Sequence, residues 1–225
     1  MTHPGADPAR SWSVVLFDLD GTVIDSAAGI VDRIAETLRR MGEPVPAEAD
    51  LLRLVGPPLR EAFTALGLDA ARAEEAVLLQ RRIAAERGPS AGAALYPGMA
   101  GLLADLSNAG IPLALATSKG QAQTESIADH FDLTPLFRVI VGASEDDARS
   151  AKADIVAETL RQLVAAGVDI SRPVLVGDRG YDVVGAAAND VPAILVEWGY
   201  GSPAEADGAL ATVASVDQLR ALLLG

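Results

Sequence analysis

Short runs of apolar residues recur along the chain, and each is typical of a strand buried on both faces of a sheet. The first run, Val14–Phe17, is apolar at every position, which favours a parallel sheet covered on both sides. Similar runs lie at 113–116, 139–141, 174–176 and 193–196, and a weaker one lies at 212–214. We predict a β-strand at each of them.

Segments with helical periodicity separate the later runs. They cover 101–109, 121–131, 153–166 and 182–189, and glycines directly follow the first and third of them. Further on, residues 202–205 have the form of a capping box with proline at the first helical position. This alternation of strands and helices predicts an α/β fold built on a doubly wound parallel sheet.

The connection between the first and second runs is far too long for a single crossover helix. It shows helical faces and no strand pattern. Ile30, Ile34 and Leu38, for example, recur at helical spacing before Gly42, which ends the pattern. An inserted group of helices is the simplest interpretation.

We therefore expect two domains. The core domain would consist of 1–26 and 95–225, and an all-helical cap domain would occupy 27–94. Two linkers would join them, one through Asp25 and the other at 88–94, which is rich in small residues.

Polar residues follow the predicted strands where each strand ends. They are Asp18 and Asp20 after the first strand, Thr117 and Ser118 after the second, Asp178 after the fourth with Asp182 one helical turn later, and Lys152 between the third and fourth strands. In open parallel sheets ligands bind beyond the carboxyl ends of the strands, so these groups should lie on one rim. Because carboxylates alone would repel each other, we expect a divalent cation there, and oxygen ligands favour Mg²⁺.

Composition narrows the function classes. The chain has 225 residues, a formal net charge of −13 and no cysteine, which excludes disulfide scaffolds, thiolate metal sites and cysteine nucleophiles. The acidic balance argues against nucleic acid polymers and anionic membranes as partners. With no targeting or membrane-spanning run visible, we expect a cytoplasmic protein acting on a small molecule.

Four short motifs stand in order at the predicted strand ends: Phe17-Asp18-Leu19-Asp20-Gly21-Thr22, Thr117, Lys152 and Gly177-Asp178-Arg179-Gly180-Tyr181-Asp182. Together they resemble the haloacid dehalogenase-like (HAD) hydrolase superfamily over essentially the whole chain. Segments 177–185, 198–202 and 55–59 are similar to the phosphoglycolate phosphatase and 5′-nucleotidase-like branch. That branch carries a helical cap after the first motif.

The resemblance implies roles for the rim residues. Asp18 would be the nucleophile that forms an aspartyl-phosphate, and Asp20 would be the general acid and then the base. Thr117 would hydrogen-bond a phosphoryl oxygen, with Ser118 beside it. Lys152 would offset charge on the nucleophile and the phosphoryl group.

The resemblance also implies the metal ligands. Asp18, the carbonyl of Asp20 and Asp178 would hold Mg²⁺, and Asp182 would bind it directly or through water. Ser118 departs from the family pattern, in which asparagine is frequent at that position.

Other residues near the motifs have less distinctive patterns. Arg53 and Arg60 flank a stiff Gly-Pro-Pro turn in the cap, and we expect them to contact the substrate. Ser26 is predicted to be only a helix N-cap. Lys119 can face the site or solvent.

The expected function is hydrolysis of a small phosphomonoester, such as phosphoglycolate or a nucleoside 5′-monophosphate, by a monomer or weak dimer. Two alternatives stay open. One is a HAD-type sugar phosphomutase, and the other is a receiver-like signalling module that is phosphorylated on aspartate. A receiver, however, has no helical insertion.

Overall fold

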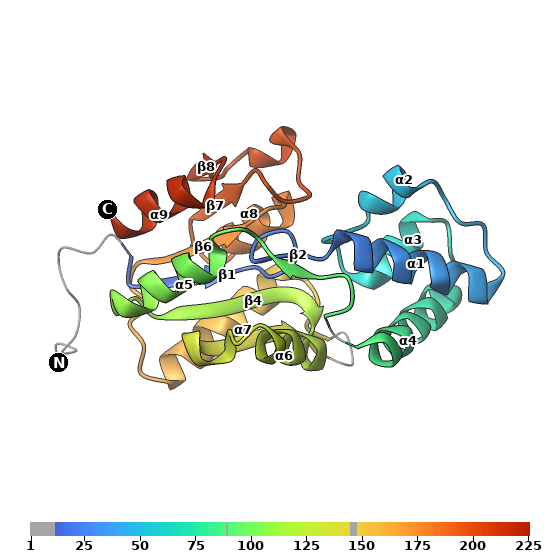
Figure 1. Ribbon diagram of the computed structural model, residues 1–225, viewed down its shortest axis with the longest axis horizontal. Helices are drawn as coiled ribbons and strands as arrows, with labels where there is room; N and C mark the ends of the chain where they lie inside the picture. The colour runs from blue at the N-terminus through green and yellow to red at the C-terminus, as the bar shows by residue number, and fades with distance from the viewer. Residues whose placement is uncertain (1–11, 89, 145–147) are drawn as a thin grey trace.

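The computed structural model describes residues 12–88, 90–144 and 148–225, so residues 1–11 of the expected core domain lie outside the described part. Six of the described strands form one parallel sheet in the order β5-β4-β1-β6-β7-β8 (Figure 1). Their bounds are β1 Val14–Phe17, β4 Leu113–Gly120, β5 Phe137–Ala143, β6 Pro173–Gly177, β7 Ala193–Val196 and β8 Ala211–Val213. The predicted α/β class is confirmed.

Helices cover both faces of this sheet. They are α5 Met99–Asn108, α6 Gln121–His130, α7 Lys152–Ala165, α8 Gly180–Ala187 and α9 Val216–Leu224, with the short 3₁₀ helices η1 Thr134–Leu136 and η2 Pro203–Ala206. The expected capping box is present at the start of η2. Among the described residues, no helix has the length and apolar character needed to cross a membrane.

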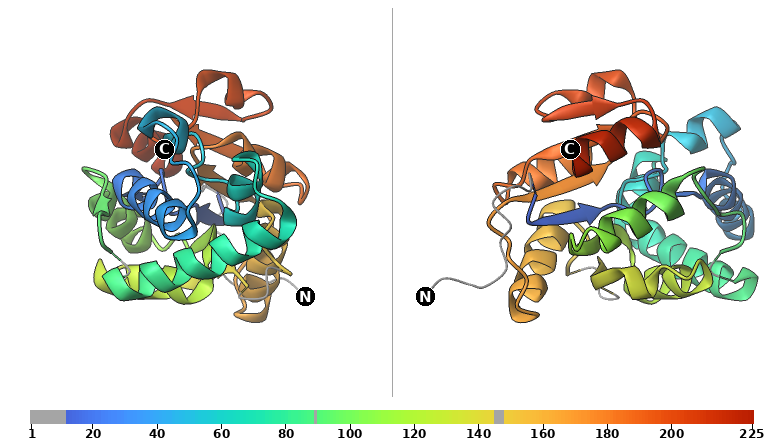
Figure 2. Two further views of the ribbon diagram at one scale, coloured as in Figure 1. Left: turned by 90° about the vertical axis from the view of Figure 1, so that its right-hand side faces the viewer. Right: turned by 60° about the vertical axis from the view of Figure 1, so that its left-hand side comes forward.

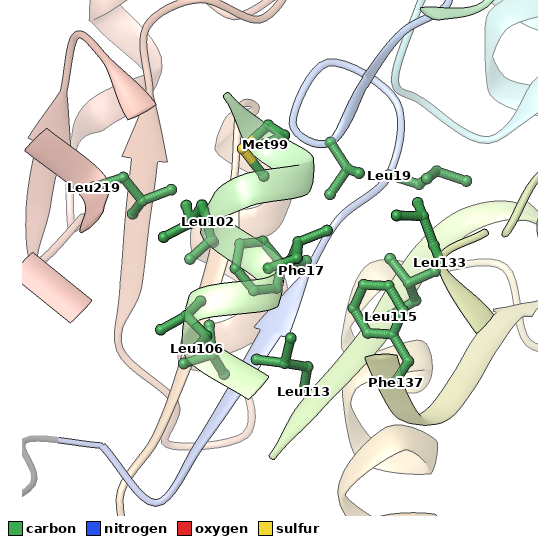
Figure 3. Packing of buried hydrophobic residues seen from close by; sticks show 14 of the residues in the cluster. Phe17, Leu19, Met99, Leu102, Leu106, Leu113, Leu115, Leu133, Phe137 and Leu219 are labelled. Atoms are coloured by element: carbon green, nitrogen blue, oxygen red, sulfur yellow. The ribbon is translucent and has the colours of Figure 1, made fainter. Parts of the chain in front are cut away.

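The core consists of two hydrophobic layers, one on each face of the sheet. Side chains of β1 alternate between them. Val15 and Phe17 join the layer formed with α5, α6 and α9, whereas Val14 and Leu16 join the layer formed with α7 and α8. Figure 3 shows Phe17 beside Leu102 of α5 in the first layer. Because β1 is buried on both faces, the loop that follows it has a rigid base.

Several element ends differ from the sequence prediction. Strand β4 continues to Gly120 instead of ending at 116, and its pairing with β5 is irregular between Ala116 and Gly120. Helix α7 begins at Lys152 and α8 at Gly180, each earlier than predicted. The apolar pattern misses these ends because the terminal residues are polar or small.

Four helices project from one edge of the sheet, to the right in Figure 1 and toward the viewer in the left view of Figure 2. They are α1 Ala27–Met41, α2 Glu48–Leu52, α3 Leu59–Ala65 and α4 Ala70–Arg87. Ile30, Ile34 and Leu38, which were predicted to share one helix face, pack together in a third hydrophobic cluster. This cluster is separate from the two core layers. Gly42 ends α1 with a φ of 72°, a left-handed conformation that favours glycine.

The two linkers pair with each other, which the sequence did not predict. Strand β2, Ile24–Asp25, lies antiparallel to β3, Ala94–Leu95. Each strand is only two residues long, too short to produce a recognisable apolar run. The expectation that this connection contains no strand is therefore wrong.

Candidate active site

Asp18 directly follows β1, the strand at which successive strands begin to be added on the other side of the sheet. The neighbours of β1 are β4 on one side and β6 on the other, and ligands of open α/β sheets bind at such a switch point. The main-chain N–H of Asp18 donates to the carbonyl of Val176 at 2.8 Å, which extends the strand pairing. Its side chain lines a cavity, yet only 8% of the residue is exposed.

Lys152, the first residue of α7, lies against Asp18. Its Nζ is 2.7 Å from Asp18 Oδ1, 2.7 Å from Asp182 Oδ1 and 2.7 Å from the carbonyl oxygen of Ala116. Burial lowers the pKa of Lys152, but the two carboxylates raise it more, so the ammonium stays charged. Burial also raises the pKa of Asp18 to about 6, against the opposing effect of Lys152.

Asp182, in the first turn of α8, is held on both of its oxygens. Oδ2 accepts hydrogen bonds from the main-chain N–H groups of Asp178 at 3.1 Å and Arg179 at 3.0 Å, while Oδ1 contacts Lys152. This residue therefore fixes the loop after β6 and positions the lysine. Its predicted place near the metal site agrees with the geometry.

Asp178 follows β6 and is 2% exposed. Its Oδ2 accepts a hydrogen bond from the main-chain N–H of Tyr200 at 2.7 Å. Among the described residues, its Oδ1 has no hydrogen-bond partner, although it is buried. Burial and the neighbouring carboxylates of Asp182 and Asp18 raise the pKa of Asp178 well above its ordinary value.

These three carboxylates fit a divalent cation. One oxygen from each of Asp18, Asp178 and Asp182 lies within 4.8 Å of the others. Three buried carboxylates lie near a single lysine, Lys152, so one positive charge does not balance them. The unpartnered Oδ1 of Asp178 is available as a ligand atom for a cation. The carboxylate of Asp20 is not in this cluster; only its main-chain carbonyl was expected to be a ligand.

The carboxylate of Asp20 points instead to a second lysine. Lys119 Nζ lies 3.0 Å from Asp20 Oδ1 and 2.7 Å from Oδ2, and both side chains are largely buried. Sequence reasoning left Lys119 undecided. The signal that could have found it is that Lys119 and Lys152 are the only lysines of the chain, which otherwise uses arginine.

Ser26 is also more than a helix N-cap. It occupies the N-cap position of α1, but its side chain makes no capping hydrogen bond and donates instead to Asp20 Oδ1. The phenol oxygen of Tyr200 does the capping, because it accepts from the N–H groups of Ser26 at 2.7 Å and Ala27 at 3.0 Å. The prediction that Ser26 only caps α1 is therefore wrong.

A cavity of about 690 Å³ separates the sheet edge from the four projecting helices. On the core side it is lined by Asp18, Asp20, Thr117, Ser118, Lys119, Lys152 and Asp182, together with residues of α6 and Arg179 and Tyr181. The structure thus brings the predicted phosphate-binding and catalytic residues to one wall. Thr117 is 2% exposed, and its hydroxyl accepts a hydrogen bond from the N–H of Lys119 at 3.4 Å.

The two cap arginines singled out in the sequence have different places. Arg60 lines the cavity and forms an ion pair with Glu74. Arg53 does not line it: its side chain is 81% exposed and pairs with Asp50. This placement gives no support to a contact of Arg53 with the substrate, so that contact stays a prediction.

Two cap residues that line the cavity were missed. Arg33 of α1 and Gln80 of α4 are each 4% exposed, and both face the cavity. In the sequence they lie on helices with ordinary amphipathic patterns, so nothing marks them as different from solvated helix residues. Only the packing of α1 against α4 turns them inward.

Arg179 links the core to the cap. From the loop after β6, its Nη1 donates to the carbonyl of Val55 in the cap and its Nε donates to Glu205 at 2.9 Å. Gly56 lies against the same guanidinium: a Cβ there would be 2.8 Å from Nη1. The metal-site loop and the Gly-Pro-Pro turn are therefore in direct contact.

Comparisons with known proteins agree with this geometry. The model of the haloacid dehalogenase-like hydrolases matches residues 15–196. Tyrosine-protein kinase PtkA of Mycobacterium tuberculosis is 43% identical over 97% of this chain and 75% of its own. A 5′-nucleotidase of Pseudomonas aeruginosa is 35% identical, with 88% and 89% covered, and a phosphoglycolate phosphatase of Caulobacter vibrioides is 32% identical, with 88% and 84% covered.

Solved structures share the fold along almost the whole chain. The crystal structure of a predicted phosphatase from Clostridium acetobutylicum superposes with a TM-score of 0.87 at 34% identity, covering 94% of this chain and 97% of the other. The structure of PtkA from Mycobacterium tuberculosis gives a TM-score of 0.80 at 41% identity, with 94% and 97% covered. Both the core and the inserted helices are thus shared with these proteins.

Proposed function

The chain belongs to the haloacid dehalogenase-like hydrolases, and on that premise we propose that it hydrolyses small phosphomonoesters through a phosphorylated Asp18. One observation carries the proposal: two aspartates two residues apart are each held by a different buried lysine, Asp18 by Lys152 and Asp20 by Lys119. Two carboxylates in different environments are suited to different roles, one as nucleophile and one as acid and base.

Asp18 would attack the phosphorus, and the bond to the leaving oxygen would break. Asp20 would give a proton to that oxygen and later take one from the attacking water, so that the aspartyl-phosphate yields free Asp18 and inorganic phosphate. The contacts of Asp20 with Ser26 and Lys119 support this role, because they orient its carboxylate toward the cavity.

Lys152, Thr117 and Ser118 would bind the phosphoryl oxygens. Lys152 is held in place by Asp182 and by the carbonyl of Ala116, so its charge is fixed beside the nucleophile before substrate arrives. Such preorganised charge is the main requirement of phosphoryl transfer.

We propose Mg²⁺ as the cation of the carboxylate cluster. Asp18, Asp178 and the main-chain carbonyl of Asp20 would hold it, with Asp182 behind them. When bound, the ion would neutralise part of the charge on the phosphoryl group and the nucleophile. The free, buried Oδ1 of Asp178 supports this assignment.

We further propose that residues 27–94 form a cap domain that covers the site during the reaction and recognises the leaving group. The paired linkers and the contact of Arg179 with Val55 support a defined closed arrangement. Exclusion of water by such lids protects reactive intermediates. A cavity of about 690 Å³ suits a small metabolite such as phosphoglycolate or a nucleoside 5′-monophosphate.

A second candidate is transfer of the phosphoryl group to a tyrosine hydroxyl. It is favoured by the relative that is named a tyrosine-protein kinase and is 43% identical to this chain. Chemically, a hydroxyl can replace water as the second nucleophile. A sugar phosphomutase is the corresponding alternative with a sugar hydroxyl, whereas a receiver-like module is disfavoured by helices α1–α4.

A substrate panel with purified protein tests these proposals. We expect release of inorganic phosphate from p-nitrophenyl phosphate and from small phosphomonoesters when Mg²⁺ is present. Asp18→Asn should abolish it, whereas the matched variant Asp32→Asn, at a cap residue that is 76% exposed, should not. Phosphotyrosine formed from ATP and a tyrosine peptide, with no hydrolysis of any phosphomonoester, would favour the kinase.

Two further proposals need separate tests. A cytoplasmic location is checked by fractionation of cells that produce the protein. A monomeric or weakly dimeric state is checked by light scattering at several protein concentrations.

A further inference from the structure

The cap wall of the cavity contains features of an anion-binding site. We propose that Arg33, together with Gln80 on the same cavity wall, binds a second anionic group on the leaving part of the substrate. The preferred substrates would then be phosphomonoesters that also carry a carboxylate or a second phosphate. This inference rests on the proposed phosphatase function and adds a substrate class to it.

Arg33 is buried and forms no ion pair with another described residue. It is 4% exposed, and within the described part of the chain no carboxylate lies within 4.0 Å of its guanidinium, so Asp20 and Asp32 act on its charge only from farther away. Less buried cap arginines do have ion-pair partners: Arg40 pairs with Glu36 and Arg72 with Glu43. Arginines are rarely buried unless they are paired, because desolvating an unpaired charge is costly. A ligand anion would supply the missing partner.

Among the described residues, the side chain of Arg33 makes one hydrogen bond, which leaves most of its donors available. Its Nη1 donates to the carbonyl of Ala91, in the linker after α4, at 3.3 Å. A guanidinium has five N–H donors, arranged so that a carboxylate or phosphate can accept two of them in parallel. The bond to Ala91 anchors the side chain, so its fork is held in place before a ligand arrives.

The two cavity walls carry different sets of charged residues. On the core wall the acidic residues Asp18, Asp20 and Asp182 are accompanied by Lys119, Lys152 and Arg179. Within the described part of the chain, the charged residues on the cap wall are Arg33, Arg60 and Arg81, and Arg60 is paired with Glu74. No described acidic residue of the cap lines the cavity, which is a specific arrangement in a chain with a net charge of −13. It favours a leaving group that is itself negative.

Gln80 gives the site a second polar contact. It lies on α4, which packs against α1, and it is 4% exposed. Its Oε1 is buried and has no hydrogen-bond partner among the described residues. This oxygen is an acceptor and cannot bind an anion, so a contact of Gln80 with the anionic group would come from its Nε2 donors. Ile30, Leu54 and Leu59 also line the cavity, and apolar surroundings strengthen charged hydrogen bonds.

A purely structural role for Arg33 makes a different prediction. If Arg33 only tied α1 to the linker through Ala91, its loss would weaken turnover of every substrate by the same factor. If Arg33 binds an anion, its loss would slow turnover of substrates that carry the second anion and leave turnover of the others unchanged. The ratio of kcat/KM between matched substrates therefore separates the two roles.

We suggest two matched substrate pairs. The first is 2-phosphoglycolate against 2-hydroxyethyl phosphate, which differ in a carboxylate. The second is glucose 1,6-bisphosphate against glucose 1-phosphate, which differ in a phosphate. We expect the wild-type protein with Mg²⁺ to prefer the doubly anionic member of at least one pair by tenfold or more in kcat/KM. The pair that shows the preference identifies the anion.

Arg33→Gln should remove at least a tenfold part of that preference, about 1.4 kcal/mol, while p-nitrophenyl phosphate is still hydrolysed. Arg33→Lys, which keeps the charge but loses the fork, should retain part of it. The matched control is Arg39→Gln on the same helix, where the side chain is 59% exposed, and it should keep the full preference. Thermal unfolding of each variant checks that the cap remains folded.

Three results would overturn the inference while leaving the proposed function intact: no preference in the wild-type protein, an unchanged ratio in both Arg33 variants, or an equal loss on both members of a pair. If Arg33→Gln does not fold, Arg33→Lys and the volume-conserving Gln80→Met are compared instead. A wild-type ratio of kcat/KM between the paired substrates in both variants would contradict the inference. Failure of the proposed function is distinguishable, because the wild-type protein would then hydrolyse no phosphomonoester at all, including p-nitrophenyl phosphate.

Discussion

At the scale of single residues, each of the two aspartates that follow β1 in the candidate active site has its own cation. Lys152 contacts Asp18 and Lys119 contacts Asp20, each at 2.7 Å. Separate partners allow neighbouring carboxylates to do different work, since each can be oriented and charged independently. The pairing of Asp20 with Lys119 leads to a specific kinetic prediction.

Lys119→Met should slow turnover most for substrates whose leaving group needs a proton from a general acid. We expect kcat to fall about 10- to 100-fold for alkyl phosphomonoesters, which have poor leaving groups, but only about threefold for p-nitrophenyl phosphate. Steady-state kinetics on both substrates check this. Arg82→Met, at an exposed cap residue, is the control. An equal loss on both substrates would show that Lys119 does not act through Asp20.

The stability of the metal-free protein should fall as the pH rises from 6 to 7.5. The pKa of Asp18 is raised to about 6 from 3.8, so the folded chain binds this proton more tightly than the unfolded chain. Protonation therefore stabilises the fold, and that contribution is lost as pH rises through about 6. Asp178, whose pKa is also raised, acts in the same direction. We expect about 0.5 kcal/mol or more over this range.

Thermal unfolding in the presence of a chelator checks this prediction. The Tm should be about 1–2 °C lower at pH 7.5 than at pH 6. Asp18→Asn should have a higher Tm than the wild-type protein at pH 7.5 and a weaker dependence on pH, because the amide does not ionise. A wild-type Tm that rises from pH 6 to 7.5 would contradict the raised pKa values.

The position of a residue on the rim could be predicted from the sequence where that residue directly follows a strand. Asp18 and Asp178 extend strands whose apolar pattern is clear, so the rim they share could be expected. Lys119, Ser26 and Arg33 could not be assigned, because their partners are 99, 6 and 58 residues away and their local patterns are ordinary. Arg53 and Arg60 could not be told apart from the sequence, which shows that the turn between them is stiff but not which of the two lines the cavity.

At the scale of elements, the loop after β7 connects the metal site to the linker. The main-chain N–H of Tyr200 donates to Asp178, and its phenol oxygen contacts three groups at the start of α1: the N–H groups of Ser26 and Ala27 and the carboxylate of Asp25. This frees the hydroxyl of Ser26 for Asp20. One residue thus ties Asp178, a proposed metal ligand, to the start of α1.

Tyr200→Phe should loosen the base of the cap without removing the ring. We expect a loss of about 1–2 kcal/mol in the free energy of unfolding, because the N–H of Ser26 loses its acceptor and the N–H of Ala27 keeps only Asp25 Oδ1 at 3.3 Å. Hydrogen exchange should become faster at the amides of Ser26 and Ala27. Tyr181→Phe, at a tyrosine that is 46% exposed, is the control. Unchanged exchange at these two amides would show that Tyr200 does not cap α1.

Sequence patterns identified most elements but not their polar ends. Every predicted core strand is present, because each has a continuous apolar run. The end of β4 was missed since it consists of Thr117, Ser118 and Lys119, which belong to the site and do not pack in the core. Strands β2 and β3 are stabilised by pairing with each other, and such pairing has no local signature.

At the scale of the whole molecule, the candidate active site at the sheet edge and the inserted helices line one cavity. The family and the phosphatase class expected from the sequence are confirmed, since the family model spans both parts and several relatives are named phosphatases. The linker strands, Arg179 and Tyr200 connect the two parts near the active site. Closure of the helices over the rim should therefore depend on the state of the metal site.

Addition of Mg²⁺ should stabilise the whole protein. An ion that binds only the folded state at about 100 times its Kd adds about 2.7 kcal/mol, which corresponds to a rise in Tm of several degrees. Asp178→Asn should lose most of this rise and most of the phosphatase activity, whereas Asp32→Asn should keep both. Excess chelator should abolish turnover reversibly. Full activity in chelator after dialysis would contradict a metal-dependent site.

The most direct test of the account is to trap the phosphorylated enzyme. Protein that is turning over p-nitrophenyl phosphate with Mg²⁺ is quenched in acid and digested, and the peptide containing Asp18 is analysed by mass spectrometry. We predict one added phosphoryl group on Asp18, more of it in Asp20→Asn because hydrolysis of the intermediate is slowed, and none in Asp18→Asn, which should also be inactive. Wild-type turnover by Asp18→Asn, or a phosphoryl group on another residue instead, would contradict the account.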